Sequence, residues 1–308
     1  MKKIMLIVLL GLQIVSCKKD NDSLEESNMD AINYHQTAVT QFVTAGETKF
    51  AYRVLGKSSG IPLVVVSPLG SSMDDWDPAI TNGLAQKNKV ILFDIEGVGS
   101  SSGSTPNNIP DMAKGVIAFI KVLGYDKINI MGFSMGAFIS QQIVLTEPTL
   151  INKLILTGTG PKGSEGLSKL PELLASSADL TPEESFLHAG FTVSEASQRE
   201  GKLAYARIQE RVMDRDRPLS AASSAAELTA VLKWAEPYPE ALKELATVAQ
   251  PILIAQGQDD VPVPVVNAIK MSESMPNAQL VVYKDAGHAA IFQYPNDFVQ
   301  RSIEFLRK

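Results

Sequence analysis

Short, continuous apolar runs recur along the chain from residue 63 onward, and they constrain its fold more than any other feature of the sequence. A continuous run of this length is typical of a parallel β-strand that is covered on both faces. Helical patterns fill the segments between the runs, so the alternation predicts a parallel sheet with crossover helices. The expected strands span residues 63–66, 90–93, 128–131, 154–156, 252–255 and 280–283.

Two further strands are expected ahead of these runs. Residues 37–43 are strand-like, and a turn signal follows at residues 45–46. Phe50, Tyr52 and Val54 then alternate with polar residues. This pattern is typical of a half-buried antiparallel hairpin. With the six apolar runs, the hairpin predicts a mostly parallel sheet of eight strands.

The clearest helix spans residues 109–123. Asn108 can cap its first turn, Pro110 lies inside that turn, and Gly124 ends the helix. Two more helices are expected at residues 135–146 and 297–306, of which the second is amphipathic and closes the chain.

The alternation of strands and helices lapses between residues 160 and 248, where no strand-like run occurs. We therefore expect a helical cap over about residues 161–248, inserted between two strands of the sheet. The predicted fold class is α/β, with a mostly parallel eight-stranded sheet, helices on both of its faces and this inserted cap.

The N-terminus has the composition of a secretion signal. Lys2 and Lys3 precede an apolar run over residues 4–15 that is too short to span a bilayer, and Ser16-Cys17 follows. This end resembles the lipobox of bacterial lipoprotein signal peptides, so Cys17 is the expected lipidation site. An ordinary signal peptide and a buried apolar helix with an incidental cysteine are the alternatives.

Residues 18–35 are mostly polar and carry both signs of charge, as a solvated tether does. The domain would then cover residues 36–308, held to a bacterial membrane by a lipid anchor only. The residue after Cys17 is Lys18 and not Asp. In this respect the N-terminus weakly resembles lipoproteins that are retained in the outer membrane rather than in the inner membrane. The expected location is therefore the cell envelope.

Charge and composition exclude several classes of function. The chain of 308 residues has a formal net charge of −6 with its basic residues scattered, so it lacks the basic patch that nucleic-acid binding requires. One Cys and three His cannot build a common structural zinc site, and a single Cys cannot form an internal disulfide. Neither a metal nor another cofactor is expected.

One short motif carries chemistry. Gly132-Phe133-Ser134-Met135-Gly136 fits the pattern G-x-S-x-G, and it lies directly between an expected strand and an expected helix. That setting is typical of a nucleophile elbow, which presents a serine hydroxyl at a helix N-terminus. Ser134 is thus the candidate nucleophile.

A serine nucleophile needs a base, and the chain has three histidines. His288 follows the last expected strand, so it lies at the same sheet edge as Ser134 and is the candidate base. His188 lies in the expected cap and His35 near the tether, and both are expected to be structural. A carboxylate must orient the base.

Asp259 and Asp260 both follow the strand at residues 252–255 and both could be this acid. The order Ser134, acid, His288 is that of α/β-hydrolases. From about residue 37 to 308 the chain resembles this family, in the branch of small esterases, lactonases and cofactor-free haloperoxidases. The resemblance favours Asp260, because the family commonly places its acid three residues after a glycine, here Gly257.

Two other segments share the resemblance. Residues 93–100 resemble the family motif D-x-R-G-x-G-x-S, with Glu96 in place of the arginine, and Trp76 lies nine residues after Ser67. The family's oxyanion hole implies the backbone amides of Met135 and Leu69 as donors. Ser67-Pro68 stands where relatives commonly have His-Gly, so the loop of Leu69 departs from the family pattern at these two positions.

The resemblance implies a serine hydrolase that cleaves carboxylic esters or lactones of small molecules through an acyl-enzyme. A haloperoxidase or perhydrolase that uses the same triad is one alternative, because peroxide can replace water in the second half-reaction. A lipid-anchored binding protein that has lost catalysis is the other, because fold alone does not fix function.

Overall fold

The structure is a computed structural model that describes residues 32–308. An eight-stranded sheet organises these residues. The strand order is β1-β2-β4-β3-β5-β6-β7-β8; β2 pairs antiparallel with β1 and β4, and every other pair is parallel. The strands are β1 (Gln41–Ala45), β2 (Thr48–Leu55), β3 (Leu63–Val66), β4 (Val90–Phe93), β5 (Ile128–Phe133), β6 (Ile151–Thr157), β7 (Ile252–Gly257) and β8 (Ala278–Tyr283). The predicted fold class is confirmed.

The expected signal peptide over residues 1–17, its lipidation site Cys17 and residues 18–31 of the expected tether lie outside the described residues. Asn33–Lys308 form one compact unit. In the described part of the chain, no helix combines the length and the apolar character needed to cross a membrane.

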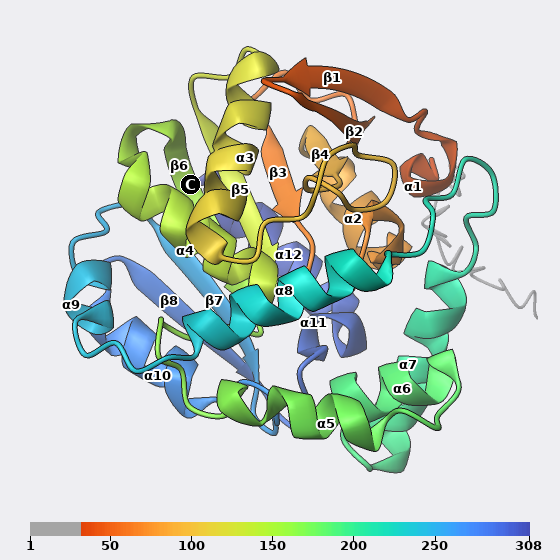
Figure 1. Ribbon diagram of the computed structural model, residues 1–308, viewed down its shortest axis with the longest axis vertical. Helices are drawn as coiled ribbons and strands as arrows, with labels where there is room; N and C mark the ends of the chain where they lie inside the picture. The colour runs from red at the N-terminus through yellow and green to blue at the C-terminus, as the bar shows by residue number, and fades with distance from the viewer. Residues whose placement is uncertain (1–31) are drawn as a thin grey trace, which may run out of the picture. The chain divides into compact units, whose positions relative to one another are not determined.

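Helices cover both faces of the sheet because its central strands are buried on both sides (Figure 1). One face packs on α3, α4 and α10, and the other on α2 and α12. These helices are α2 (Pro78–Ala85), α3 (Ile109–Val122), α4 (Met135–Thr146), α10 (Val266–Ser274) and α12 (Pro295–Arg307).

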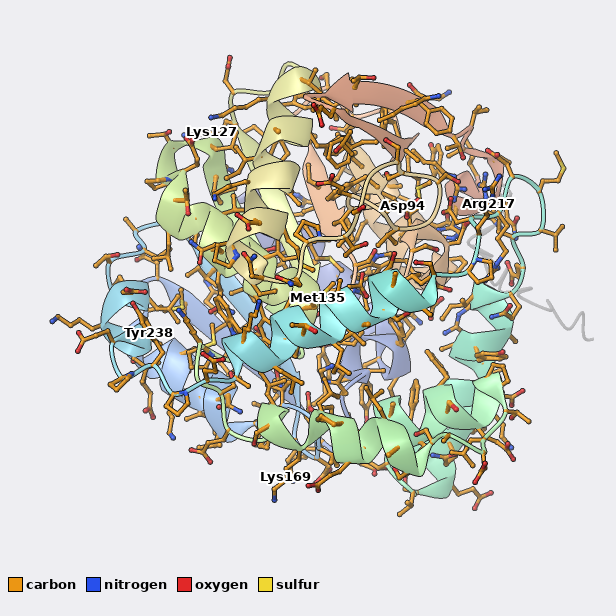
Figure 2. All side chains as sticks on the ribbon, viewed as in Figure 1. Asp94, Lys127, Met135, Lys169, Arg217 and Tyr238 are labelled. Carbon is orange, nitrogen blue, oxygen red and sulfur yellow. The ribbon has the colours of Figure 1, made fainter. Side chains whose placement is uncertain are left out.

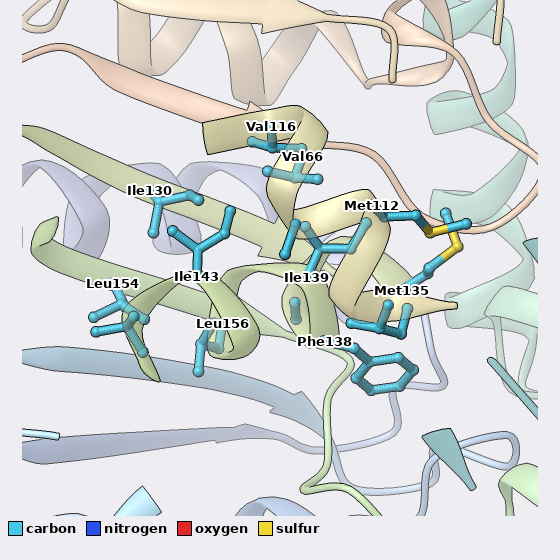
Figure 3. Close-up of a cluster of buried hydrophobic side chains, with 14 of the residues drawn as sticks. Val66, Met112, Val116, Ile130, Met135, Phe138, Ile139, Ile143, Leu154 and Leu156 are labelled. Carbon is cyan, nitrogen blue, oxygen red and sulfur yellow. The ribbon is translucent and has the colours of Figure 1, made fainter. Parts of the chain in front are cut away.

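The core on the first face fixes where α4 begins. Figure 3 shows Met112 of α3 and Met135 of α4 pointing toward one another, with Phe138 and Ile139 beside them. Val66, at the end of β3, belongs to the same buried cluster. This packing holds the start of α4 against the carboxyl end of the sheet.

Sequence patterns located most elements closely, but the first segment differs from expectation. A strand was expected from residue 37, whereas Tyr34–Thr37 form a short helix, α1, and β1 begins at Gln41. Asn33 Oδ1 caps α1 by accepting from Gln36 N at 3.1 Å. Buried His35 packs there, with Nδ1 2.9 Å from Thr81 Oγ1. Residues 33–35, expected in the tether, therefore belong to the folded unit.

The insertion between β6 and β7 is helical, as expected. It contains α5 (Leu170–Ser176), α6 (Pro182–Gly190), α7 (Glu195–Ile208), α8 (Ala221–Trp234) and α9 (Ala241–Leu245). Val231 and Trp234 of α8 and Leu245 of α9 join the core cluster that holds α3 and α4, so the last part of the insertion packs on the domain core. None of the side chains of α5 is buried.

Buried charges hold the cap to the first strands. Arg53 of β2 pairs with Asp74, and Asp74 Oδ2 accepts from the amide of Asp216, in the loop between α7 and α8, at 2.6 Å. Arg53 also donates to the carbonyl of Asp214 at 2.7 Å. These side chains of Arg53, Asp74 and Asp216 are each 1% exposed. The loop is therefore anchored by a desolvated ionic network, which is costly to break.

Candidate active site

Ser134 lies at a sharp turn between β5 and α4. Its backbone angles are φ 52° and ψ −117°, in a region that a residue other than glycine rarely occupies. The amide of Ser134 donates to Thr157 O of β6 at 2.9 Å, which holds the turn. This is the strained geometry of a nucleophile elbow, with the serine at the positive end of α4.

Two glycines make this turn sterically feasible. A Cβ atom on Gly132 would lie 2.3 Å from Gly136 O, and one on Gly136 would lie 2.1 Å from Val66 O. Both positions therefore exclude a side chain. The second close approach also brings the start of α4 against the end of β3, and hence against the loop that begins at Ser67.

His288 lies in the loop between β8 and α11 (Ala290–Gln293). Its Nδ1 atom is 2.8 Å from Oδ2 of Asp260. Asp260 is buried and its Oδ1 accepts from Val263 N at 2.8 Å, whereas the Asp259 side chain is exposed. Of the two candidate acids, the structure thus places Asp260 beside His288.

The Nε2 atom of His288 has no hydrogen-bond partner among residues 32–308, and neither does the hydroxyl of Ser134. Ser134 and His288 line the same cavity. Gly158, directly after β6, packs against the imidazole ring, because a Cβ added there would lie 3.0 Å from His288 Cε1. Nε2 is therefore the ring atom that can exchange a proton with a group in the cavity.

Gln256, at the end of β7, is a site residue that the sequence analysis missed. Its Nε2 donates to Asp260 Oδ2 at 2.7 Å and to Val263 O at 2.8 Å, and its Oε1 accepts from Thr159 N at 2.9 Å. The side chain is fully buried. Gln256 thus fixes the carboxylate that contacts His288. A polar residue directly after an apolar strand was the available signal.

The two expected oxyanion donors lie in two segments that border the cavity of Ser134, Met135 next to Ser134 in the chain and Leu69 in the cavity lining. Met135 is the first residue of α4, so its amide has no partner within the helix, and its side chain turns into the core (Figure 3). Leu69 lines the cavity with Ser134. Neither amide donates to another group in the described part of the chain.

The loop that carries Leu69 is held from two sides. Trp76 Nε1 donates to Ser67 Oγ at 3.0 Å, which explains the spacing of these two residues in the sequence. On the other side, Gly70 N donates to Glu227 Oε2 of α8 at 2.7 Å. Glu227 was not expected to belong to the site. Burial raises the pKa of Glu227 to about 7.

The cavity next to Ser134 has a volume of about 630 Å³ and is mostly apolar. The cap supplies one wall and the loops at the carboxyl edge of the sheet supply the other. Asp75 and Gln209 add polar groups to the lining. The apolar cap residues in the lining include Leu170, Leu173, Leu174, Phe186, Tyr205, Ile208 and Val231. Such a site suits a small molecule with a substantial apolar part.

Similarity to known proteins assigns this chain to a family. A family model described as alpha/beta hydrolase fold matches residues 61–295. The chain belongs to the alpha/beta hydrolase fold family. Among solved structures, an alpha/beta hydrolase fold protein from Chitinophaga pinensis is 38% identical, with a TM-score of 0.86 over 88% of this chain and 98% of that one. The family expected from the sequence is confirmed.

Two curated relatives are enzymes whose names give different substrates. A poly(3-hydroxyalkanoate) depolymerase from Ectopseudomonas oleovorans is 27% identical over 82% of this chain and 87% of its own length. A 2-hydroxy-6-oxononadienedioate/2-hydroxy-6-oxononatrienedioate hydrolase from Burkholderia vietnamiensis is 27% identical over 91% of this chain and 99% of its own length. The first name describes a depolymerase and the second a hydrolase.

Within this alpha/beta hydrolase fold, the segment over residues 93–100 is structural. Asp94, on the loop after β4 (Figure 2), accepts from Met73 N at 2.9 Å and from Ser100 N at 3.1 Å. Burial, together with the nearby Asp216 carboxylate, raises the pKa of Asp94. Glu96 packs beside Gly103, whereas the Asp94 carboxylate packs beside Gly99. The missing arginine therefore leaves the turn itself intact.

Proposed function

We propose that this chain is a serine hydrolase that cleaves carboxylic esters or lactones of small molecules through an acyl-enzyme. The observation that carries the proposal is the convergence on one cavity of Ser134, at a strained elbow, and His288, whose Nδ1 is held by Asp260. The named relatives, one of which depolymerises a polyester, support this class of reaction.

In the proposed reaction, Ser134 Oγ attacks the carbonyl carbon while its proton passes to His288 Nε2. Asp260 keeps the imidazole in the required tautomer and stabilises the imidazolium. The amides of Leu69 and Met135 donate to the oxyanion. His288 then gives the proton to the leaving oxygen, and water, deprotonated by His288, releases the acyl group from Ser134.

The substrate is proposed to have an apolar acyl or alcohol group. Leucine side chains of α5 and aromatic side chains of α6 and α7 line the cavity, and its volume of about 630 Å³ is in the range of small-molecule sites. Their apolar surface contributes binding energy by leaving water.

A panel of p-nitrophenyl esters and lactones, assayed with the purified protein and with its Ser134→Ala variant, tests the proposal. We expect hydrolysis by the wild type that the variant lacks, with a preference for apolar acyl groups. Labelling of Ser134 by an alkyl phosphonate measures the nucleophile independently of substrate choice. Undiminished hydrolysis by Ser134→Ala would refute the proposed mechanism.

On sequence grounds we also propose that Cys17 carries a lipid and holds this hydrolase in the cell envelope. The support is the basic start, the apolar run and the Ser16-Cys17 junction. Metabolic labelling with an alkyne fatty acid should mark the wild type and not the Cys17→Ser variant. Equal labelling of the two would contradict this location.

A further inference from the structure

Glu227 is a buried carboxylate on the cap helix α8, directly behind the loop that carries Leu69. The residue is 0% exposed. Its Oε2 atom accepts from Gly70 N at 2.7 Å, and its Oε1 atom has no hydrogen-bond partner among the described residues. One turn further along α8, Val231 lines the cavity beside Ser134. Glu227 therefore contacts the rim of the site without entering it.

A carboxylate at this position is unfavourable for packing alone. The other buried residues of α8 are Ser223, Ala230, Val231 and Trp234, and Glu227 forms no ion pair in the described part of the chain. Burying a carboxylate without a countercharge costs free energy that a leucine would not. The one contact that offsets this cost is the bond to Gly70.

That bond decides which amide of the loop remains free. Gly70 has a φ of +78°, so the backbone turns sharply there, and its N–H is directed at α8. The preceding amide, that of Leu69, has no acceptor among residues 32–308. Because the peptide between Leu69 and Gly70 is planar, holding its N–H fixes the position of Leu69 Cα, and only the two backbone torsions of Leu69 separate this plane from the Leu69 amide.

We propose that Glu227 is a positioning residue that holds the Gly70 amide from the cap and thereby aims the Leu69 amide at the oxyanion. This inference rests on the proposed serine hydrolase function. Cap helix α8 then contributes to transition-state stabilisation through the loop after β3, in addition to closing the cavity. The required group is a hydrogen-bond acceptor at the distance of Oε2.

Three substitutions separate the acceptor from the charge and from the volume of the side chain. Glu227→Gln keeps an acceptor at the same distance, Glu227→Asp keeps the carboxylate but retracts it by one methylene, and Glu227→Leu removes the acceptor. Ser224→Ala, at an exposed position on α8, is the matched control. A chromogenic ester that the wild type hydrolyses through Ser134 serves as substrate.

We expect Glu227→Asp and Glu227→Leu to lower kcat by about 10- to 100-fold with KM within about threefold, because a misdirected oxyanion donor weakens only the transition state. The affinity for an alkyl boronic acid, which forms a tetrahedral adduct with serine, should fall by a similar factor. Glu227→Gln and Ser224→Ala should stay within about threefold of the wild type in both measurements.

Hydrogen exchange at the Gly70 amide provides a readout that does not depend on activity. The amide should exchange at least about tenfold faster in Glu227→Asp and Glu227→Leu than in the wild type and Glu227→Gln, because a broken hydrogen bond removes local protection. If Glu227→Leu does not fold, the comparison of Asp with Gln remains decisive, since both keep a polar side chain.

Several results would overturn the inference. They are unchanged Gly70 exchange in Glu227→Asp, an unchanged kcat in that variant, a loss confined to KM, and a loss in Glu227→Gln as large as in Glu227→Asp. Failure of the proposed function has a different signature: the wild type itself would show no hydrolysis that depends on Ser134, whatever the exchange at Gly70.

Discussion

The Nδ1 atom of His288 lies 2.8 Å from Oδ2 of Asp260, and Gln256 donates to that same oxygen at 2.7 Å. An asparagine at position 260 would present an amide to the imidazole and to Gln256, so His288 would lose its tautomer and its orientation. We expect Asp260→Asn to lower kcat by about 10⁴-fold. Steady-state hydrolysis of a p-nitrophenyl ester measures the change.

Asp259→Asn is the control for this variant, because the neighbouring side chain is exposed and the partner of His288 Nδ1 is Asp260. It should retain kcat within about twofold. If Asp259→Asn were as impaired as Asp260→Asn, the assignment of the acid would be wrong.

A methyl group at Gly136 should disrupt the elbow. Its Cβ would lie 2.1 Å from Val66 O, so α4 would have to move away from β3 and carry Ser134 with it. We expect Gly136→Ala to lose at least about tenfold in kcat/KM, since small displacements of a nucleophile cost that much. Its unfolding temperature should also fall.

Gly115→Ala is the matched comparison, because nothing lies within 4 Å of the added atom in the middle of α3. It should keep full activity and gain about 0.5 to 1 kcal/mol in the free energy of unfolding. A stable and fully active Gly136→Ala would contradict the steric argument.

The Glu227 carboxyl should make the protein less stable as the pH rises. Burial raises its pKa from 4.5 to about 7. Between these values the folded chain keeps a proton that the unfolded chain releases, so the free energy of unfolding falls by about 3 kcal/mol in total as pH increases from 4.5 through 7. Glu227→Gln removes this titration.

Urea unfolding of the wild type and Glu227→Gln at pH 5 and pH 8 tests this sign. The free energy of unfolding of Glu227→Gln minus that of the wild type should be larger at pH 8 than at pH 5. Glu236→Gln, an exposed substitution shortly after α8, should show no such gain. A pH-independent difference between wild type and Glu227→Gln would argue against a raised pKa.

Buried His35 should make the protein less stable as the pH falls. Burial lowers its pKa from 6.5 to about 4, with Arg53 and Arg211 adding to the shift and Asp74 opposing it. Between pH 6.5 and 4 the unfolded chain binds a proton that the folded chain does not. The free energy of unfolding therefore decreases by about 3 kcal/mol as the pH falls across this range.

His35→Asn keeps a polar atom near Thr81 Oγ1, which lies 2.9 Å from Nδ1, and it does not titrate. Measured by urea unfolding at pH 7.5 and 4.5, it should lose less stability on acidification than the wild type. The exposed His188→Asn variant should follow the wild type. Equal acid sensitivity of His35→Asn and the wild type would show that His35 does not titrate in this range.

The sheet and Ser134 were predictable because they leave local signals. A strand buried on both faces reads as a continuous apolar run, and the elbow needs glycine two residues before and two after its serine. His288 followed from its place after the last strand. The family resemblance favoured Asp260 over Asp259, and the structure supplies the physical reason, because the path of the loop buries Asp260 and exposes Asp259.

The remaining site residues depend on contacts between distant segments. Glu227 lies 157 positions from Gly70, and nothing in the local pattern of α8 indicates that the cap returns to this loop. Helix α1 is similarly hidden, since a helix of four residues has no periodicity and owes its stability to Asn33 and α2. Tertiary packing decides both.

Leu170, Leu173 and Leu174 of α5 line the cavity, although none of the side chains of α5 is buried. Substitutions at partly exposed positions usually change stability by little. One wall of the substrate cavity can therefore mutate at little thermodynamic risk, while the elbow and the loops around His288 cannot. Helix α5 is therefore a segment in which substitutions can reshape the lining of the cavity while the fold stays intact.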